Sequence, residues 1–206
     1  EPSAMKQPAI TSLTTRLRTL IDTNHGTTRG WVRTMLAQTE YVLGRVEDHI
    51  HPVGREVDRL VFVCLGNINR SAFAEHVAKR MGANTCSIGL STTTGAPAFH
   101  KAIQTALQFA LDLSLHRATD MSEYSFRSTD LLLAMEIRHA RQLVAAGIPK
   151  QSIALLGNWA SPHRIHLHDP HTLSDAYFRT CFTLIQSAVQ GLVSEMRSSQ
   201  SPCMLQ

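Results

Sequence analysis

The sequence predicts an α/β protein with a parallel sheet covered by helices on both faces. Short apolar runs, beginning at Leu60, Thr85, Asp130 and Ser152, alternate with longer stretches of helical periodicity. Strands that alternate with helices in this way form a parallel sheet, and the helices cover both of its faces. The chain has 206 residues, which is enough for one such domain with an appendage, or for two small domains.

Before the first strand, two apolar patterns at helical spacing predict a helical hairpin. One stops at Asn24-His25-Gly26 and the other follows Gly30; their members are Ile10, Leu13, Leu17, Leu20, Ile21, Val32, Met35, Leu36, Val42, Leu43, Val46 and Ile50. We expect the hairpin to pack on the main domain or to dimerise, since amphipathic helices usually bury their apolar face in their own protein. Docking a partner and covering a ligand site are the alternatives. His51-Pro52-Val53-Gly54 is typical of a linker, so the predicted divisions are an extension over 6–56, a main domain over 57–197 and a tail over 198–206.

The first strand runs into a loop bounded by a cysteine and an arginine. Cys64 ends the apolar run and Arg70-Ser71 opens a helical pattern; the loop between them is Leu65, Gly66, Asn67, Ile68 and Asn69. Five residues between a cysteine and an arginine suit a loop whose N–H groups point inward at one tetrahedral oxyanion. Gly66 and Asn67 tolerate the positive φ that such a loop requires. The loop is therefore predicted to cradle a phosphate.

The same geometry gives the cysteine a chemical role. Inward N–H dipoles, a helix N-terminus and a nearby guanidinium all favour the thiolate, which is the nucleophilic form of Cys64. The planar fork of Arg70 can hold two phosphoryl oxygens at once. Ser71 can donate to the thiolate or cap the helix. The alternative is a buried cysteine at a strand end beside an ordinary turn.

The helix after the loop has an apolar face at Phe73, Val77 and Met81 and ends at Gly82. The elements predicted beyond it are a strand over 85–88, a loop over 89–97, a helix over 98–113, a helix around 122–126, a strand over 130–135, a helix over 137–146, a strand over 152–156 and a closing helix over 174–196. Ligands of open parallel sheets bind at the carboxyl ends of the strands, which is where Cys64 falls.

Four stretches together resemble the low-molecular-weight protein-tyrosine phosphatases. They are the loop from Val63 to Ser71, Asp-Leu-Ser-Leu-His-Arg-Ala at 112–118, the Asp130 strand ending in Met135-Glu136, and Asp169-Pro170 before the last helix. The resemblance covers roughly residues 59 to 196. It implies a four-stranded parallel sheet flanked by helices, no metal or other cofactor, and hydrolysis through a phosphocysteine. It also implies Cys64 as nucleophile, Arg70 as phosphate clamp, Ser71 as thiolate partner, Asn67 as loop-shaping residue and Asp169 as general acid.

A carboxylate is also expected from the chemistry. Expelling a phenolate or alkoxide from phosphorus needs a proton on the leaving oxygen, and breaking the thiophosphate afterwards needs an activated water. One aspartate on a loop above the pocket can do both. Asp169 fits because Pro170 stiffens the loop that presents it; its alternative role is that of a turn aspartate before a helix.

Some positions depart from the family pattern. Many members carry a second cysteine inside the loop, where this chain has Asn69, so protection of Cys64 by a disulfide there is not expected. The aromatic residues that usually enclose the phosphotyrosine ring are replaced by His171-Thr172 after Asp-Pro and by Thr92-Thr93-Thr94 in the other loop. We expect Tyr177, Phe178 or Trp31 to line the pocket instead.

Three alternatives to a tyrosine phosphatase stay open at this point. Arginine phosphatases resemble the family but carry threonine where this chain has Ile68, and an apolar residue there suits an aromatic substrate better. The substrate could also be a small molecule. Finally, His163, His166, His168 and His171 surround Asp169, and imidazoles near a carboxylate can bind a transition metal, so a phosphate-binding module with a metal site at this loop is a further reading.

Composition sets the remaining expectations. A net charge of +4 with a pI of about 9.1 fits an anionic substrate, and no basic patch interleaved with aromatic residues indicates nucleic acid. The four cysteines show no framework spacing, and no run is long enough to span a membrane. We therefore expect a cytoplasmic protein with reduced thiols. Its expected partner is a phosphotyrosine-containing protein; the resemblance implies a bacterial tyrosine kinase of exopolysaccharide export, and the hairpin offers a route to an oligomer.

Overall fold

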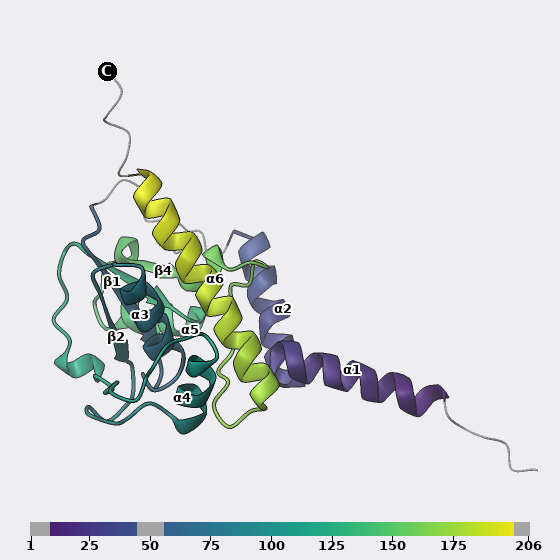
Figure 1. Cartoon of the computed structure of the whole chain (residues 1–206). Coiled ribbons are helices and arrows are strands. Elements are labelled where there is room, and N and C mark those ends of the chain that lie inside the picture. The colour runs from purple at the N-terminus through teal and green to yellow at the C-terminus, as the bar shows by residue number, and fades with distance from the viewer. Residues whose placement is uncertain (1–8, 45–55, 200–206) are drawn as a thin grey trace, which may run out of the picture.

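A computed structural model describes residues 9–44 and 56–199 and contains the predicted parallel sheet (Figure 1). Its four strands are β1 (Arg59–Cys64), β2 (Thr85–Gly89), β3 (Asp130–Ala134) and β4 (Ile153–Leu155). They lie in the order β2-β1-β3-β4, and every pair is parallel. The predicted fold class is confirmed. The register aligns Cys64 with Gly89 and Val63 with Ala134, so the strand that carries Cys64 is central.

One face of the sheet is covered by three helices: α3 (Arg70–Arg80), α4 (His100–Leu107) and α6 (Asp175–Ser199). Successive side chains of a strand point to opposite faces, and Leu60 and Phe62 of β1 join this side. They pack with Phe73 of α3 and with Phe178 and Phe182 of α6 in the larger core cluster. The rings of Phe73 and Phe182 stack with centroids 3.9 Å apart.

The other face is covered by α5 (Ile137–Ala145) together with an N-terminal helix, α2 (Thr28–Val42). Val61 and Val63 of β1 join this second cluster, as do Leu143 of α5 and Ala37 of α2. Part of the N-terminal extension therefore belongs to the core of the main domain. The prediction that the extension packs on the main domain is supported for α2.

The first helix, α1 (Ala9–His25), meets α2 at a tight turn and then extends away from the rest of the molecule (Figure 1). The turn is at Gly26, whose φ of +76° favours glycine and where a Cβ would lie 2.8 Å from the Tyr177 ring. Leu13, Leu17 and Leu20 of α1 are more than half exposed. A stripe of apolar residues predicts a helix correctly, but it does not tell how much of the stripe is covered.

Three predicted boundaries are wrong. The apolar pattern predicts a second helix that reaches Ile50, but α2 ends at Val42, and Gly44 two residues later adopts a φ of +68°. Val46, Ile50 and the predicted linker lie outside the described residues. The helix over 98–113 is confined to α4, because Ala110 turns left-handed at φ 55° and Leu111 bonds back to Ala106. The helix around 122–126 is a single turn, Met121–Glu123.

The other predicted elements are present with end shifts of a few residues, and α6 continues to Ser199. Two short 3₁₀ helices, Lys150–Ser152 and Leu156–Trp159, flank β4. In the described part of the chain, no helix has both the length and the apolar character needed to cross a membrane.

Candidate active site

Cys64 is the last residue of β1 and lies at the carboxyl end of the sheet, 2% exposed. Its Sγ lies 3.0 Å from Ser71 Oγ and accepts the backbone N–H of Asn67 at 3.3 Å. Ser71 Oγ already accepts an N–H from the Asn67 side chain at 2.8 Å, so its own proton is available for the sulfur. Two donors therefore converge on the cysteine sulfur.

Asn67 fixes the shape of the loop with nearly every polar atom it has. Its φ is 51°, its Nδ2 also donates to Ser87 Oγ at 2.7 Å, and its Oδ1 accepts the N–H of Thr119 at 2.9 Å. Its backbone carbonyl accepts from His116 Nε2 at 2.7 Å. Asparagine is one of the residues that tolerate this left-handed conformation. The expectation of a positive φ at Gly66 is wrong, because the turn is made by Asn67 alone within the loop.

Gly89, at the end of the neighbouring strand, makes room for the loop. A Cβ at this position would lie 2.8 Å from Thr92 Cγ2, 3.0 Å from the Leu65 carbonyl oxygen and 3.1 Å from Asn67 Cβ. Thr92 Oγ1 in turn donates to the Gly66 carbonyl at 2.7 Å. Sequence reasoning missed Gly89; a glycine at the end of a strand pattern is the signal that could have found it.

Arg70 is completely buried and its guanidinium is held from two sides. Nη1 donates to Glu136 Oε1 at 2.5 Å and to the Leu167 carbonyl at 2.8 Å, and Nη2 donates to Asp169 Oδ2 at 2.8 Å. Burial would lower the pKa of Arg70, but the two carboxylates raise it above its ordinary value. Within the described part of the chain, Nε has no hydrogen-bond partner. One buried donor is therefore left for a ligand.

Glu136, the residue just before α5, anchors this arginine and was not predicted as a site residue. Burial would raise the pKa of Glu136, but the positive charge of Arg70 holds it well below its usual range. Arg138 Nε contacts the same carboxylate at 2.7 Å, and the imidazoles of His139 and His166 each lie 3.8 Å from it. Chiefly through burial, the pKa of His139 falls to about 3 and that of His166 to about 4. Both are neutral at pH 7.

Asp169 reaches the same guanidinium from the loop before α6. Its carboxylate is partly exposed and accepts the backbone N–H of His171 at 3.1 Å through Oδ1. Burial would raise the pKa of Asp169, but Arg70 and this N–H lower it. Because Arg70 closes the loop that begins at Cys64, the structure brings Cys64, Arg70 and Asp169 to one site.

The rim of the loop carries an aromatic pair. Asn69 Nδ2 lies 3.4 Å from His171 Nδ1, and the His171 ring lies 4.5 Å from that of Phe99, centroid to centroid. The N–H of Phe99 donates to the Ile68 carbonyl at 3.0 Å. Leu65, a residue of the loop itself, is 37% exposed. Aromatic and apolar side chains thus stand beside the Cys64 loop.

Two of the residues expected to line the pocket do not. Tyr177 is buried, and its hydroxyl donates to the His168 carbonyl at 3.2 Å. Phe178 is fully buried in the core cluster between the sheet and α6. Both lie on the inner side of α6, so the expectation for them is wrong. Trp31, 40% exposed on α2, stays a prediction.

The histidines around Asp169 do not form a metal site. His163 packs on Tyr41 at 4.8 Å, His171 on Phe99, and His166 faces Glu136. The rings of His166 and His168 stack with centroids 5.7 Å apart, but His163 and His171 point to other parts of the molecule, so the four imidazoles do not converge on one point. Among the described residues, the one group of three ligand atoms close enough for a metal is elsewhere, at Glu75, His76 and His116.

Comparison with known proteins agrees with this geometry. The family model for low molecular weight phosphotyrosine protein phosphatase matches residues 59–201. The chain belongs to this family. It is thereby a phosphoric monoester hydrolase of the protein-tyrosine phosphatase class. The match begins at β1, so α1 and α2 lie outside the part of the chain that the family shares.

The chain aligns with individual relatives over almost the whole length of those relatives. The low molecular weight protein-tyrosine-phosphatase Wzb of Salmonella typhi is 30% identical over 146 residues, which are 69% of this chain and 97% of that protein. The crystal structure of the Erwinia amylovora tyrosine phosphatase AmsI superposes with a TM-score of 0.64 at 25% identity, over 71% of this chain and 98% of that one.

The fold is also shared with a phosphatase named for a different substrate. The arginine phosphatase YwlE from Geobacillus stearothermophilus superposes with a TM-score of 0.62 over 72% of this chain and 98% of that one, at 19% identity. At this identity the likeness shows the fold alone. The substrate of the present phosphatase has to be argued from its own site residues.

Proposed function

We propose that the protein hydrolyses the phosphotyrosine of proteins through a phosphocysteine intermediate on Cys64. The observation that carries the proposal is the closed loop from Cys64 to Arg70. At one end the sulfur receives two hydrogen bonds, and at the other Arg70 is bound to Asp169 while its Nε is left without a partner among the described residues. A nucleophile, a phosphate clamp and an acid are thus placed around one point.

The first step forms a sulfur–phosphorus bond and breaks the bond from phosphorus to the aryl oxygen. Cys64 attacks as the thiolate, and the hydrogen bonds from Ser71 and Asn67 hold its sulfur in position. The leaving oxygen takes its proton from the carboxyl group of Asp169. In the second step water attacks phosphorus, Asp169 takes a proton from that water, and the thiolate leaves with release of inorganic phosphate.

Arg70 has two tasks in this scheme. Its free Nε–H and the Nη2–H now on Asp169 form the fork that fits two phosphoryl oxygens. Glu136 binds Nη1, which is the guanidinium nitrogen outside this fork, and so fixes the orientation of Arg70. When a phosphoryl dianion occupies the fork it competes with Asp169 for Arg70. The pKa of that carboxyl then rises from its depressed value, as an acid in the first step requires.

The rim favours an aryl substrate. Phe99 and His171 offer aromatic faces beside the loop, and Leu65 is an exposed apolar contact. A flat aryl ring that carries the phosphate can stack on these side chains. A phosphoarginine would instead place a charged guanidinium against the apolar side chain of Ile68, which offers it no hydrogen-bond acceptor. Ile68 and Leu65 therefore support phosphotyrosine over phosphoarginine.

We further propose a cytoplasmic role on a phosphotyrosine-bearing protein, with a bacterial tyrosine kinase of exopolysaccharide export as the expected partner. Support comes from the curated relative named a protein-tyrosine phosphatase and from the aryl character of the rim. The domain divisions at 56/57 and 197/198, and an oligomer formed through the N-terminal helices, also stay predictions.

The test compares phosphate release from phosphotyrosine, phosphoserine and phosphoarginine peptides by the wild-type chain, Cys64→Ser and Cys86→Ser. Cys86 is the matched control, because it is a free cysteine on β2 outside the loop. We expect Cys64→Ser to lose all turnover while it still binds phosphate or vanadate, and Cys86→Ser to keep it. Rapid quenching of the wild type with radiolabelled phosphopeptide should trap one phosphoryl group on Cys64.

Two results would contradict the proposal. Undiminished hydrolysis by Cys64→Ser would show that Cys64 is not the nucleophile. Faster turnover of phosphoarginine, phosphoserine or a small phosphate ester than of phosphotyrosine would leave the chemistry standing but overturn the aryl substrate.

A further inference from the structure

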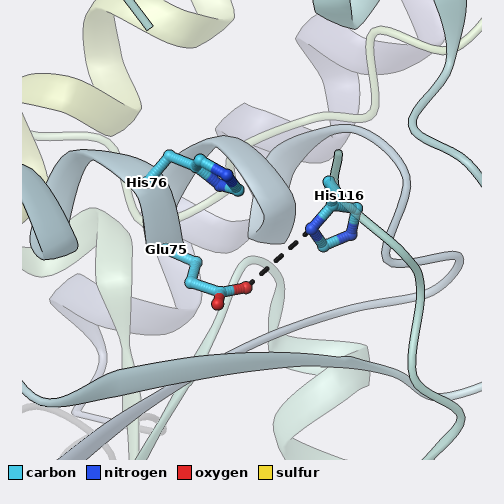
Figure 2. Close-up of side chains that lie close together, drawn as sticks. All are labelled: Glu75, His76 and His116. Atoms are coloured by element: carbon cyan, nitrogen blue, oxygen red, sulfur yellow. Dashed lines mark ion pairs between the residues drawn. The ribbon is translucent and has the colours of Figure 1, made fainter. Parts of the chain in front are cut away.

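A cluster of three possible metal ligands lies next to the phosphate loop, where His116 contacts the Asn67 carbonyl. Glu75 and His76 are adjacent on α3, and His116 comes from the segment between α4 and β3 (Figure 2). The ligand atoms of the three residues all lie within 4.8 Å of one another, and His116 Nδ1 is 4.0 Å from Glu75 Oε2. The three line a surface cavity of ≈ 370 Å³, which gives an ion and its water a way in.

The hydrogen bonds of the two histidines leave their lone pairs free for a metal. His76 Nδ1 bonds to the Ala72 carbonyl at 2.9 Å, and His116 Nε2 bonds to the Asn67 carbonyl at 2.7 Å. A carbonyl only accepts, so each of these nitrogens carries the proton and the other ring nitrogen carries the lone pair. A metal-binding histidine typically has this arrangement, with one nitrogen on the ion and the other donating to a carbonyl or carboxylate.

We propose that Glu75, His76 and His116 form a binding site for a single Zn²⁺ ion, with water in the fourth position. Two imidazole nitrogens and one carboxylate oxygen are a common set of protein ligands for zinc. Tetrahedral bonds of about 2.0–2.1 Å place ligand atoms about 3.3 Å apart, so small rotations of the side chains close the site. Mg²⁺ and Ca²⁺ prefer sites built wholly of oxygen ligands.

Positive charge in the same cavity opposes the ion and offers a test. Lys79 Nζ lies 2.5 Å from Glu75 Oε1, and Arg117 also lines the cavity. Glu75 Oε2 accepts from Ser87 Oγ and keeps a second lone pair on the side of His116. Removing the ammonium group of Lys79 should therefore strengthen zinc binding, because it competes for the same carboxylate.

The site is joined to the nucleophile by a chain of hydrogen bonds. Ser87 donates to Glu75, the Asn67 amide donates to both Ser87 and Ser71, and Ser71 contacts the sulfur of Cys64. His116 adds a second link through the Asn67 carbonyl. An ion on Glu75 and His116 would thus bias the residue that shapes the loop. This inference does not depend on the substrate or on the reaction proposed above.

The experiment measures Zn²⁺ binding by titration calorimetry in a Cys64→Ser background, so that the loop thiol does not bind the ion. We expect one ion per chain, at least about tenfold weaker binding in His76→Ala, and tighter binding in Lys79→Met. His163→Ala is the matched control and should bind as the background does. His76 is only partly buried, and circular dichroism of each variant checks that it is folded; His76→Gln serves if His76→Ala is not.

Co²⁺ and Ca²⁺ serve as further probes of the same site. Bound Co²⁺ should show the strong visible absorption of tetrahedral coordination, without a sulfur-to-cobalt charge-transfer band, and Ca²⁺ should not compete. The proposal is overturned if folded His76→Ala or His76→Gln binds Zn²⁺ unchanged, if His163→Ala abolishes binding, or if a charge-transfer band reveals a cysteine ligand. None of these measurements uses phosphatase activity. A failure of the proposed zinc site can therefore be distinguished from a failure of the proposed function.

Discussion

The contact between Arg70 and Asp169 joins the proposed phosphate clamp to the proposed general acid. The fully buried guanidinium of Arg70 lies 2.8 Å from Asp169 Oδ2. This ion pair favours the ionised form of the Asp169 carboxylate while no phosphate is bound. A substrate dianion that takes over the guanidinium releases the carboxylate and allows it to be protonated. In the proposed mechanism, binding of the substrate phosphate thus activates the acid that acts on it.

Replacing the acid by its amide, Asp169→Asn, should therefore lower kcat for phosphotyrosine by about 10²–10⁴-fold, because the leaving phenolate loses its proton donor. With p-nitrophenyl phosphate the loss should be smaller, since that leaving group needs less protonation. Steady-state kinetics with both substrates make the measurement. Asp175→Asn is the control and should leave kcat unchanged, because Asp175 is an exposed residue of α6 that pairs with Lys101 of α4. Equal losses with the two substrates would speak against general acid catalysis by Asp169.

At this scale the sequence predicts the residues whose neighbours are close in the chain. Cys64, Asn67, Arg70 and Ser71 fall within eight positions, and the loop geometry follows from their types and order. The site residue Glu136 was missed because its contact with Arg70 spans 66 positions and depends on the pairing of β1 with β3. The aromatic rim was missed for the same reason: Phe99 and His171 meet only in the folded chain.

At the scale of elements, α2 packs directly against the loop that carries Asp169. A Cβ on Gly30 would lie 2.7 Å from His168 Cδ2, the residue just before Asp169. On the same loop, Arg164 Nη1 donates to the Asn24 carbonyl at 2.6 Å, and His163 packs on Tyr41. The N-terminal helices therefore pack against and support the loop that carries Asp169, called the acid loop below. These helices lie outside the family match.

Gly30→Ala tests this support. The added methyl group would overlap the backbone carbonyl oxygen of His25 as well as the ring of His168, so α2 must shift or both of them must move. A shift of about 1 Å in a catalytic group can cost up to about 10²-fold in rate. We expect kcat to fall while the inhibition constant of phosphate changes little, because the Cys64 loop is not touched. Thr39→Ala, at an exposed position of the same helix, should be neutral. A Gly30→Ala enzyme with normal kcat, folded by circular dichroism, would show that α2 does not position the acid.

The helix ends also show where sequence patterns stop being sufficient. Ile103, Leu107 and Leu111 share one helical stripe, yet α4 ends at Leu107 and Leu111 enters the core from the following turn. The left-handed residue that makes this possible is Ala110, a residue type that gives no turn signal. By contrast, Gly82 and Gly147 mark the ends of α3 and α5 correctly, because glycine adopts a positive φ at little cost.

For the whole molecule, the buried cluster around Glu136 links catalysis to stability. Arg70, Glu136, His139 and His166 lie together where the sheet, α5 and the acid loop meet, and both histidines are neutral in the folded state. Keeping these imidazoles uncharged lets Glu136 direct its charge to Arg70. The same arrangement makes the folded state sensitive to acid.

The free energy of unfolding should consequently fall as the pH is lowered from about 6.5 to about 4. The folded-state pKa values of His139 and His166, about 3 and about 4, lie below the unfolded value of about 6.5. The unfolded chain therefore binds more protons in this range, and stability is lost as pH falls, by up to about 1.4 kcal/mol per pH unit for each histidine. Glu136 adds a loss in the same direction below about pH 4.5, since its own pKa is depressed.

Urea unfolding of the wild type and of His166→Gln at several pH values between about 7 and 5 measures this slope. His166→Gln keeps a neutral polar side chain beside Glu136 and should show a clearly flatter dependence, with one titrating group removed. His100→Gln, at an exposed position on α4, should follow the wild type. If His166→Gln and the wild type lose stability at the same rate, His166 is not held neutral by the fold, and the buried cluster is not what makes the molecule acid-sensitive.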